Sequence, residues 1–451
     1  MRVCFIIIIL ITLVQSSFTQ ANNVSLLSHW SNPSLPTLYD GESVYNEVWG
    51  FIKDDIEYAV IGSRMGTHIL MIDLNNQLVE IDFIIGKHTG SDAIHRDYHD
   101  YQNYLYAVCD EGPSSLQIMD LSYLPDSVSL VYDNDSLITR SHNIFIDTAY
   151  AKLYSCSNKN QSGNNALKVL DISNPTAPTF MYNYDLVSHV HDAYVLNDTA
   201  FLNCGNQGLK VITSSSQSNV IQIGELSTYP HKGYNHAGWL NKEGDIYVMC
   251  DENHGLDVKV LDVSDLNDIK VESLFNSQMG DDANSIPHNV IIRNNIAYVS
   301  YYHDGLQVFD LGNPALPQKI GHYDTYNGNP AVPYAGCWGV YPFRDGDKIL
   351  VSDRANGLFL LGFQPPPLTV EHPFEIFPNP SNGLLYFFKE HYLIADYNLY
   401  IYNALGQKML EVNSNTDYTY LDLTNFRTGL YFINYISNVD DSFFTEKFFI
   451  E

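Results

Sequence analysis

One phrase recurs along the chain at a nearly fixed interval: an alternating apolar run that ends on an aspartate or its replacement. It reads "GLQVFDLGNP" at residues 305–314. A repeat of about 42–52 residues has to be considered before any fold, because each copy buries its apolar face only against its neighbours. The seven final positions of the phrase are Asp73, Asp120, Asp171, Thr213, Asp262, Asp310 and Gly362.

Each copy contains four short apolar segments, as residues 288–325 show best. The segments read "HNVIIRNN", "IAYVSYY", "HDGLQVFDL" and "GNPALPQKIGHYDT". Runs of four to six apolar or alternating residues, bounded by Gly, Asn, Asp or Pro, are strand and turn signals. Four antiparallel strands in about 48 residues, repeated seven times, predict an all-β chain with a seven-bladed β-propeller.

The ring needs a closing strand. The seventh copy ends at "GLFLLGF" (357–363) and lacks a fourth strand, which would leave an exposed sheet edge. The N-terminal "LLSHW" (26–30) is similar to "KIGHY" (319–323), the fourth strand of the sixth copy. We therefore expect the N-terminal strand to complete the last blade.

The repeated aspartate has a structural explanation. It ends a strand and precedes Ser or Gly, Asn and Pro in "DLSYLP", "DISNP" and "DLGNP". An aspartate at that place can accept hydrogen bonds from backbone amides two residues further on and fix the turn. We predict that the phrase is scaffold and that its aspartates are turn residues.

The cysteines also follow the repeat. The first four lie 46 to 48 residues apart, each in a strand-like run, a spacing that fits one recurring buried position better than a disulfide framework. The five that follow residue 20 are Cys109, Cys156, Cys204, Cys250 and Cys337. We predict that they are packed as free thiols.

The N-terminus predicts export. Residues 1–20 have one early arginine, a short apolar run and small polar residues, the layout of a signal peptide. Neither this run nor any other stretch has the length and flanks of a membrane span, so we expect no transmembrane segment in the mature protein. With 52 acidic and 23 basic residues the net charge is −29, which disfavours nucleic acid as a partner.

Residues 24–363 resemble a known family. The matching stretches include "YAVIGSRMGTHI", "HDAYVLNDT", "VSYYHDGLQVFD", "CWGVYPF" and "LVSDRANGLF". They are similar to the LVIVD-repeat proteins, and within them to the "choice-of-anchor B" family of exported bacterial propellers. "HRDYHDY" (95–101) departs from the family, which more often has tryptophan before Arg-Asp. This family has no established activity, so the resemblance implies a scaffold only.

We expect the propeller to span residues 21–363. A second unit follows it. "QPPPLTVEHP" (364–373) predicts a stiff linker, and residues 374–451 predict a small β-sandwich. This last segment resembles the type A C-terminal sorting domain of the type IX secretion system of Bacteroidetes. The resemblance implies handling by that machinery and a secreted or outer-surface location. The matching motif residues are Pro378, Asn379, Pro380, Gly383, Gly406 and Gly429.

Histidine, aspartate and tryptophan recur where each copy starts. The innermost strand of a propeller blade begins at one mouth of the central channel, so these side chains are expected to converge there. They could bind a polar ligand or a metal ion, or they could only bond neighbouring blades. The loops between second and third strands open on the same face and add one further candidate, His303. The nine candidates for ligand binding are Trp49, Asp97, His142, His191, Asp192, His236, His288, His303 and Trp338.

The expected function is an extracellular binding or adhesion module for a protein or glycan. The sequence contains no recognisable hydrolase, metalloprotease or nucleotide-binding motif, so we lean against an enzyme. The alternative is an extracellular hydrolase or lyase that uses a metal or a His/carboxylate set at the channel mouth. No cofactor is identified, and a divalent metal stays open.

Overall fold

The structure is a computed structural model. It describes residues 21–37, 43–160, 163–214, 220–280, 285–328, 332–344, 346–366, 374–389, 396–416, 418–438 and 443–451. Contacts divide the chain into two compact units, residues 1–365 and 366–451. The expected signal peptide and residues 367–373 of the expected linker lie outside the described residues.

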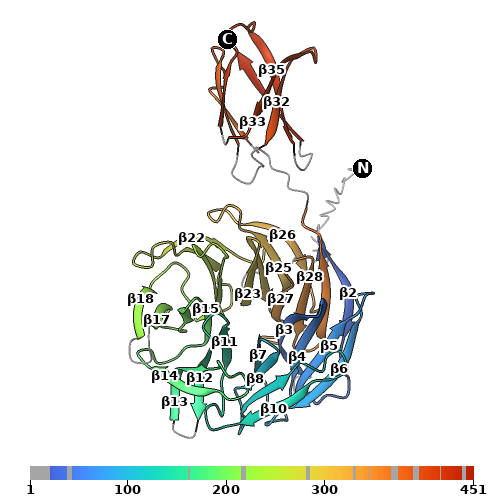
Figure 1. Cartoon of the computed structure of the whole chain (residues 1–451), viewed down its shortest axis with the longest axis vertical. Coiled ribbons are helices and arrows are strands. Elements are labelled where there is room, and N and C mark those ends of the chain that lie inside the picture. The colour runs from blue at the N-terminus through green and yellow to red at the C-terminus, as the bar shows by residue number, and fades with distance from the viewer. Residues whose placement is uncertain are drawn as a thin grey trace, which may run out of the picture. The chain divides into compact units, whose positions relative to one another are not determined.

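The first unit is a propeller of antiparallel sheets around a central channel (Figure 1). Blades 1 to 4 follow chain order. Blade 1 has β3 (Tyr45–Lys53), β4 (Ile56–Ser63), β5 (Gly66–Ile72) and β6 (Leu78–Ile85). Blade 2 has β7 (Arg96–Tyr101), β8 (Tyr104–Cys109), β9 (Leu116–Asp120) and β10 (Ser129–Asn134). Blade 3 has β11 (Asn143–Asp147), β12 (Lys152–Asn160), β13 (Gly163–Asp171) and β14 (Thr179–Tyr184). Blade 4 has β15 (Asp192–Leu196), β16 (Thr199–Asn203), β17 (Leu209–Ser214) and β18 (Val220–Leu226).

Blades 5 to 7 complete the ring. Blade 5 has β19 (Asn235–Leu240), β20 (Ile246–Asp251), β21 (Val258–Asp262) and β22 (Lys270–Phe275). Blade 6 has β23 (Pro287–Arg293), β24 (Ile296–Tyr301), β25 (Gly305–Asp310), β26 (Gln318–Tyr323) and the added β1 (Ala21–Asn22). Blade 7 has β27 (Cys337–Pro342), β28 (Lys348–Asp353), β29 (Gly357–Phe363) and β2 (Val24–Trp30). The predicted seven-bladed β-propeller is confirmed.

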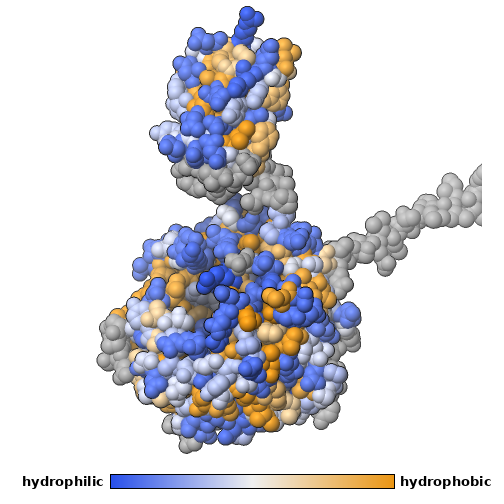
Figure 2. Space-filling view, turned by 45° about the vertical axis from the view of Figure 1, so that its right-hand side comes forward, coloured by the Kyte–Doolittle hydropathy of each residue, from blue (hydrophilic) through white to orange (hydrophobic). Residues whose placement is uncertain are grey.

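The innermost strands pack side by side around the channel. Each contacts the innermost strand of the next blade, and β27 of blade 7 contacts β3 of blade 1. Apolar side chains fill the space between blades, for example Val248 and Val260 of blade 5 against Val290 of blade 6. On the face drawn in Figure 2, hydrophilic residues gather around the central hollow, and hydrophobic residues form scattered patches elsewhere on the propeller.

The N-terminal strand is the outer strand of the last blade. β2 pairs antiparallel with β29, in a register that sets Leu26 opposite Leu361 and Trp30 opposite Leu358. Val24 is buried between blades 6 and 7, and Trp30 packs on the core between blades 7 and 1. The pairing gives blade 7 its fourth strand and covers the edge of β29.

The repeated aspartates are turn residues, as predicted. In each of the five copies that keep it, a side-chain oxygen accepts a hydrogen bond from the amide two residues further on. For Asp310 the donor is the Gly312 amide at 2.7 Å, and for Asp171 it is the Ser173 amide at 2.8 Å. Asp73, Asp120 and Asp262 make the same bond.

The cysteine prediction is also confirmed. All five described cysteines are free and buried. Cys109 and Cys250 are the last or next-to-last residues of β8 and β20, and Cys156 lies in β12, so each sits in the second strand of its blade. Burial raises the pKa of the Cys204 thiol to about 12, as expected for an unreactive packing residue.

The second unit is a β-sandwich of two antiparallel sheets. One sheet contains β30 (Phe374–Phe377), β31 (Leu384–Lys389) and β34 (Tyr418–Asp422). The other contains β33 (Lys408–Ser414), β32 (Tyr397–Asn403), β35 (Gly429–Ser437) and β36 (Phe443–Ile450). Phe387 and Ile433, one from each sheet, belong to its shared core. No helix that could cross a membrane occurs in the described part of the chain.

Three of the motif residues in this unit have clear local roles. The Asn379 side chain accepts from the Phe449 amide at 3.0 Å and donates to the Lys447 carbonyl at 3.2 Å, which ties the segment to β36. Gly383 has φ +98° and Gly406 has φ +76°, so both turns use the left-handed region that favours glycine. A role of these residues in sorting stays a prediction.

Candidate functional site

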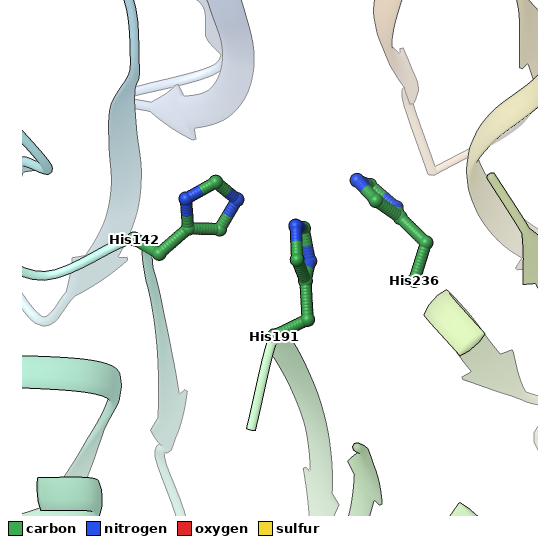
Figure 3. Close-up of side chains that lie close together, drawn as sticks. All are labelled: His142, His191 and His236. Atoms are coloured by element: carbon green, nitrogen blue, oxygen red, sulfur yellow. The ribbon is translucent and has the colours of Figure 1, made fainter. Parts of the chain in front are cut away.

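Six aromatic side chains form a closed ring at one mouth of the channel. One comes from each of blades 2 to 7, at or just before the start of the innermost strand. We call this set the mouth ring: His95, His142, His191, His236, His288 and Trp338. Figure 3 shows His142, His191 and His236 with their imidazoles turned toward one another.

The rings are in contact all the way round. Centroids are 5.2 Å apart for His95 and His142, and 4.0 Å apart for His142 and His191. The His191–His236 and His236–His288 separations are 4.0 and 4.4 Å. Trp338 closes the ring at 4.3 Å from His288 and 5.3 Å from His95.

β-Bulges help to aim these side chains. The register shifts between Asn235 and Ala237 in β19, and equivalent shifts occur at the starts of β23 and β27. An extra residue in one strand redirects its side chain, and His236 is such a residue. The β7–β8 pair of blade 2 has no shift, so His95 occupies the mouth position while Arg96 turns away to donate to the Ser63 and His88 carbonyls.

Carboxylates from the loops between second and third strands hold the outer side of the ring. Asp110 Oδ2 is 2.8 Å from His142 Nδ1, and Glu111 hydrogen-bonds with His95 Nδ1. The Tyr302 hydroxyl donates to Glu252 Oε1, and Glu252 Oε2 lies 3.8 Å from His236 Nε2. These contacts fix several of the imidazoles in orientation.

A second tier of polar residues, partly or fully buried, lies next to the mouth ring. Its carboxylates, which we call the carboxylate tier, are Glu47, Asp97 and Asp192. Glu47 accepts from the Val48 amide at 3.0 Å and from Asn289 Nδ2 at 2.8 Å. Asp97 accepts from the Ile144 amide at 2.6 Å. The hydrogen bonds of this tier come from amide and indole N–H groups.

Burial controls the charge of both layers. It raises the pKa of Glu47 to about 7 and that of Asp192 to about 7, and it raises the pKa of Asp97, where the Glu47 charge adds to the effect. Burial, together with neighbouring imidazoles, lowers the pKa of His191 and His236. His191 and His236 are therefore neutral imidazoles beside the carboxyl groups of Glu47 and Asp192, which ionise near neutral pH. His142 differs, because the Asp110 carboxylate outweighs the effect of burial and raises its pKa.

The Glu47 carboxyl predicts a measurable pH dependence. In the folded chain its pKa is about 7 against an ordinary 4.5. The native state therefore binds more protons than the unfolded state between these pH values, and stability falls as pH rises through this window and stays lowered above it. Glu47→Gln should remove this dependence, so its unfolding free energy should gain about 2–3 kcal/mol on wild type between pH 5 and pH 8.

Urea unfolding of the full chain at these two pH values, with a chelator present, measures the gain. Asn289 can accept from the new amide by turning its own, because its Oδ1 has no other partner among the described residues. The control is Glu243→Gln, an exposed residue in the turn between β19 and β20. A Glu47→Gln difference that is the same at both pH values would contradict the prediction.

Two spaces of very different size adjoin the mouth ring. The cavity inside the ring and the carboxylate tier is only about 20 Å³. Beside it lies an open depression of about 540 Å³, which we call the mouth depression. The lining residues of the depression are Asn206, Lys232, Gly233, Tyr234, Glu252, Asn253 and Tyr334.

The mouth depression and the ring are linked through shared residues. The Tyr234 hydroxyl is 2.7 Å from His189 Nε2, and its ring is 5.5 Å from that of His191. Glu252 lines the depression and also contacts Tyr302 and His236. A ligand in the depression would therefore lie against groups that contact the mouth ring.

Seven of the nine predicted site residues meet at the ring and carboxylate tier: Asp97, His142, His191, Asp192, His236, His288 and Trp338. The other two do not join them. Trp49 lies two residues beyond Glu47 on β3, where its indole donates to Asp100 Oδ1 at 2.8 Å. His303 leaves the channel, because its Nε2 bonds with the Val332 carbonyl and its ring stacks on Tyr326.

Sequence reasoning missed Glu47 and placed Trp49 at the mouth instead. Successive blades are about 50 residues apart, and the position 50 residues before Asp97 is Glu47. Counting one repeat back from Asp97 would therefore have predicted Glu47 as a site residue. The carboxylate reaches toward blade 7, where a Cβ on Gly339 would lie 1.9 Å from Glu47 Oε1. The mouth depression was also missed, since its residues come from separate loops.

Comparison with known proteins identifies both units of the chain. Residues 375–451 match the family model of the secretion system C-terminal sorting domain. Residues 162–186 and 287–325 match the LVIVD repeat. The two LVIVD matches lie in blades 3 and 6 of the propeller, and the sorting domain indicates export through type IX secretion to the cell surface or the extracellular space. No curated protein sequence matches the chain.

Solved structures share the propeller fold. The periplasmic gluconolactonase PpgL of Pseudomonas aeruginosa is 11% identical with a TM-score of 0.52, over 84% of this chain and 100% of that one. A protein from Lactobacillus plantarum is 11% identical with a TM-score of 0.51, over 84% and 99%. At this identity the likeness shows the fold alone.

A third solved structure comes from a secretion component. PorZ, an essential bacterial surface component of the type-IX secretion system of Porphyromonas gingivalis, is 10% identical, with 89% of this chain covered. The chain spans 59% of the length of PorZ, and the TM-score is 0.47. At that score the likeness supports no statement about the function of this chain.

Proposed function

We propose that this exported LVIVD-repeat propeller is an extracellular binding module for a neutral glycan, which it holds in the mouth depression. The observation that carries the proposal is the depression itself, a polar hollow of about 540 Å³ with two tyrosines in its lining. Its volume is in the range of small-ligand sites. Amide, ammonium and carboxylate groups offer hydrogen bonds to hydroxyls, and the tyrosines offer flat apolar faces.

Tyr334 is held in place at some cost to the backbone. Its φ is +57°, in the left-handed region that a bulky residue rarely adopts. Its carbonyl accepts from the Arg354 guanidinium, and its ring is 5.3 Å from Tyr302 and 5.8 Å from His254. Backbone strain of this kind concentrates at ligand-contacting positions, and it supports a binding role for this ring.

Overall charge favours a neutral ligand over an anionic one. The chain has a net charge of −29, so polyanions are repelled over long range. Inside the depression the Lys232 side chain donates to the Ser227 carbonyl, which engages it with the protein. A hydroxyl-rich neutral ligand needs no compensating charge and suits this lining.

The alternative function, an extracellular hydrolase or lyase at the channel mouth, receives less support. The imidazoles and carboxyl groups with shifted pKa face a cavity of about 20 Å³. That volume admits one small ion or one water molecule. A substrate could reach only the outermost groups, so general acid–base chemistry by the buried layer would lack a reacting partner.

Tyr334→Ala tests the binding proposal. The full chain and the variant would be applied to an array of immobilised neutral glycans, and affinities for the bound glycans measured by calorimetry. We expect Tyr334→Ala to weaken binding about tenfold or more, because aromatic anchors contribute a large share of contact energy. Tyr150→Ala, an exposed tyrosine in the turn between β11 and β12, should bind as wild type. Binding of no glycan, or equal loss in both variants, would overturn the proposal.

A further inference from the structure

We propose that the mouth ring holds one divalent transition-metal ion, bound by imidazole nitrogens of His142, His191 and His236. The proposal concerns the ring and not the mouth depression, so it stands independently of the glycan proposal. The three histidines lie at or just before the starts of β11, β15 and β19, in three successive blades. An ion at this place would join those blades at the channel mouth.

The geometry is close to that of a bound site. One ligand nitrogen of each of the three histidines lies within 4.8 Å of the other two. Two nitrogens bound to one zinc-like ion at about 2.1 Å can be at most about 4.2 Å apart. A tetrahedral ion sets its nitrogens about 3.4 Å apart, so the three nitrogens would have to approach one another by at most about 1.4 Å. In Figure 3 the imidazole of His191 stands between those of His142 and His236, which are turned toward it.

Two of the three histidines have buried nitrogens that lack a partner. His191 and His236 are 7% and 3% exposed. Among the described residues neither Nδ1 atom has a hydrogen-bond partner. A buried polar atom left unpaired costs roughly 1–3 kcal/mol, so such atoms call for an explanation. Coordination of one ion would satisfy both.

The third histidine, His142, is oriented by Asp110. Asp110 Oδ2 is 2.8 Å from His142 Nδ1, which leaves Nε2 on the ring side as the coordinating nitrogen. Histidines that bind metals are commonly oriented by a carboxylate on the other nitrogen. Asp110 is on the loop after β8, so the arrangement depends on blade 2 as well as blade 3.

The surrounding charges suit a dication. Asp97 of the carboxylate tier is buried, Glu47 and Asp192 are half-buried, and the hydrogen bonds of the tier come from neutral N–H groups. Buried carboxylates need a compensating charge or must stay protonated. A divalent ion in the adjacent ring would supply that charge at a distance short enough to matter in a dry site.

The ligand type and the cavity size define the class of ion. Imidazole suits zinc, copper, nickel, cobalt and iron, whereas calcium and magnesium prefer oxygen ligands. A cavity of about 20 Å³ holds one ion and excludes an organic cofactor. Glu252, 3.8 Å from His236 Nε2, places a negative charge beside the nitrogen of this imidazole that does not bind the ion.

Metal titration of the untagged full chain tests the proposal. After dialysis against a chelator, we expect ZnCl2 to bind with a stoichiometry of one per chain and to raise the melting temperature, since an ion that binds only the folded state stabilises it. CoCl2 should give the visible absorption of a four- or five-coordinate site with nitrogen ligands. No stoichiometric binding, or a six-coordinate cobalt spectrum, would overturn the proposal.

Three variants locate the ion. His191→Gln and His236→Gln should each lower zinc affinity at least 100-fold, and Asp110→Asn, which removes an orienting contact, should lower it about 10–100-fold. The matched control is His29→Gln on β2, the outer strand of blade 7, where Nε2 bonds with the Asn356 carbonyl. Zinc affinity at wild-type level in His191→Gln and His236→Gln would place the ion elsewhere. If either Gln variant fails to fold, Asp110→Asn still decides the matter.

Discussion

A chain that begins at residue 32, without β1 and β2, is expected to form no stable propeller. β2 is the fourth strand of blade 7, and its backbone covers the edge of β29 along six paired positions from Val24 to Trp30. Removing it exposes that edge and uncovers apolar side chains of two interblade cores. An uncovered apolar edge strand promotes pairing with other molecules.

The size of the effect follows from burial. Val24, Leu27 and Trp30 pack on the cores beside blade 7, and burial of each large apolar side chain contributes roughly 1.5–3 kcal/mol. Leu27 and Trp30 are half-buried, so the sum is about 3–6 kcal/mol before any hydrogen bond is counted, a large part of the stability of a typical domain, about 5–15 kcal/mol. The truncated chain should therefore lose cooperative unfolding.

Near-ultraviolet circular dichroism and thermal melting measure the outcome. The matched control begins at Asn23, lacks only the two-residue β1, and should melt cooperatively like the full chain. A synthetic peptide of residues 21–37, added in trans, should restore the signal of the truncated chain. A chain from residue 32 that melts within a few degrees of the control would show that β2 contributes little.

Lys259→Met is expected to lower the unfolding free energy by about 3–5 kcal/mol. Lys259 and Asp251 form an ion pair of 3.0 Å in which both side chains are fully buried. Asp251 also accepts from the Tyr229 hydroxyl and the Gly233 amide. Loss of the ammonium group leaves a buried carboxylate without its counter-charge, which is the costly outcome for such pairs.

A double mutant separates the charge from the packing. Lys259→Met combined with Asp251→Asn removes both charges, so it should be more stable than Lys259→Met alone in urea unfolding. Lys270→Met is the control for removal of a lysine from an exposed pair, with Asp268, and should change stability little. If Lys259→Met unfolds at the same urea concentration as Lys270→Met, the buried pair is not needed for stability.

The propeller was predictable from the sequence because its signal is repeated. Seven copies of one pattern average out local irregularities, and turn residues such as Asp310 act within two residues of their own position. The resemblance of residues 24–363 and 374–451 to known families came from the same repeated and local motifs. Most of the fold could therefore be predicted from residues that act close to their own position in the chain.

The site was only partly predictable, since it depends on register and on contacts between blades. A one-residue shift at the start of β19, β23 or β27 decides which side chain faces the mouth. No residue type in the sequence predicts such a bulge. Glu47 takes its place because Gly339 of another blade leaves room for it. Tyr334 and Tyr234 come from separate loops and line the same depression only in the folded chain. Nothing in the sequence therefore indicates that they lie close together.

The joint between β2 and β29 also sets an order of events in folding. Ser25 and Gly362, which touch across it, are 337 positions apart, among the longest separations a contact in this chain can have. Such distant contacts form late, because a long loop must be closed before they stabilise anything. During synthesis β2 is made before its partner β29, so β2 stays unpaired until β29 has been made. Until β2 pairs with β29, blade 7 has only three strands. The rate of this pairing decides between a closed monomer and strand exchange with a second copy.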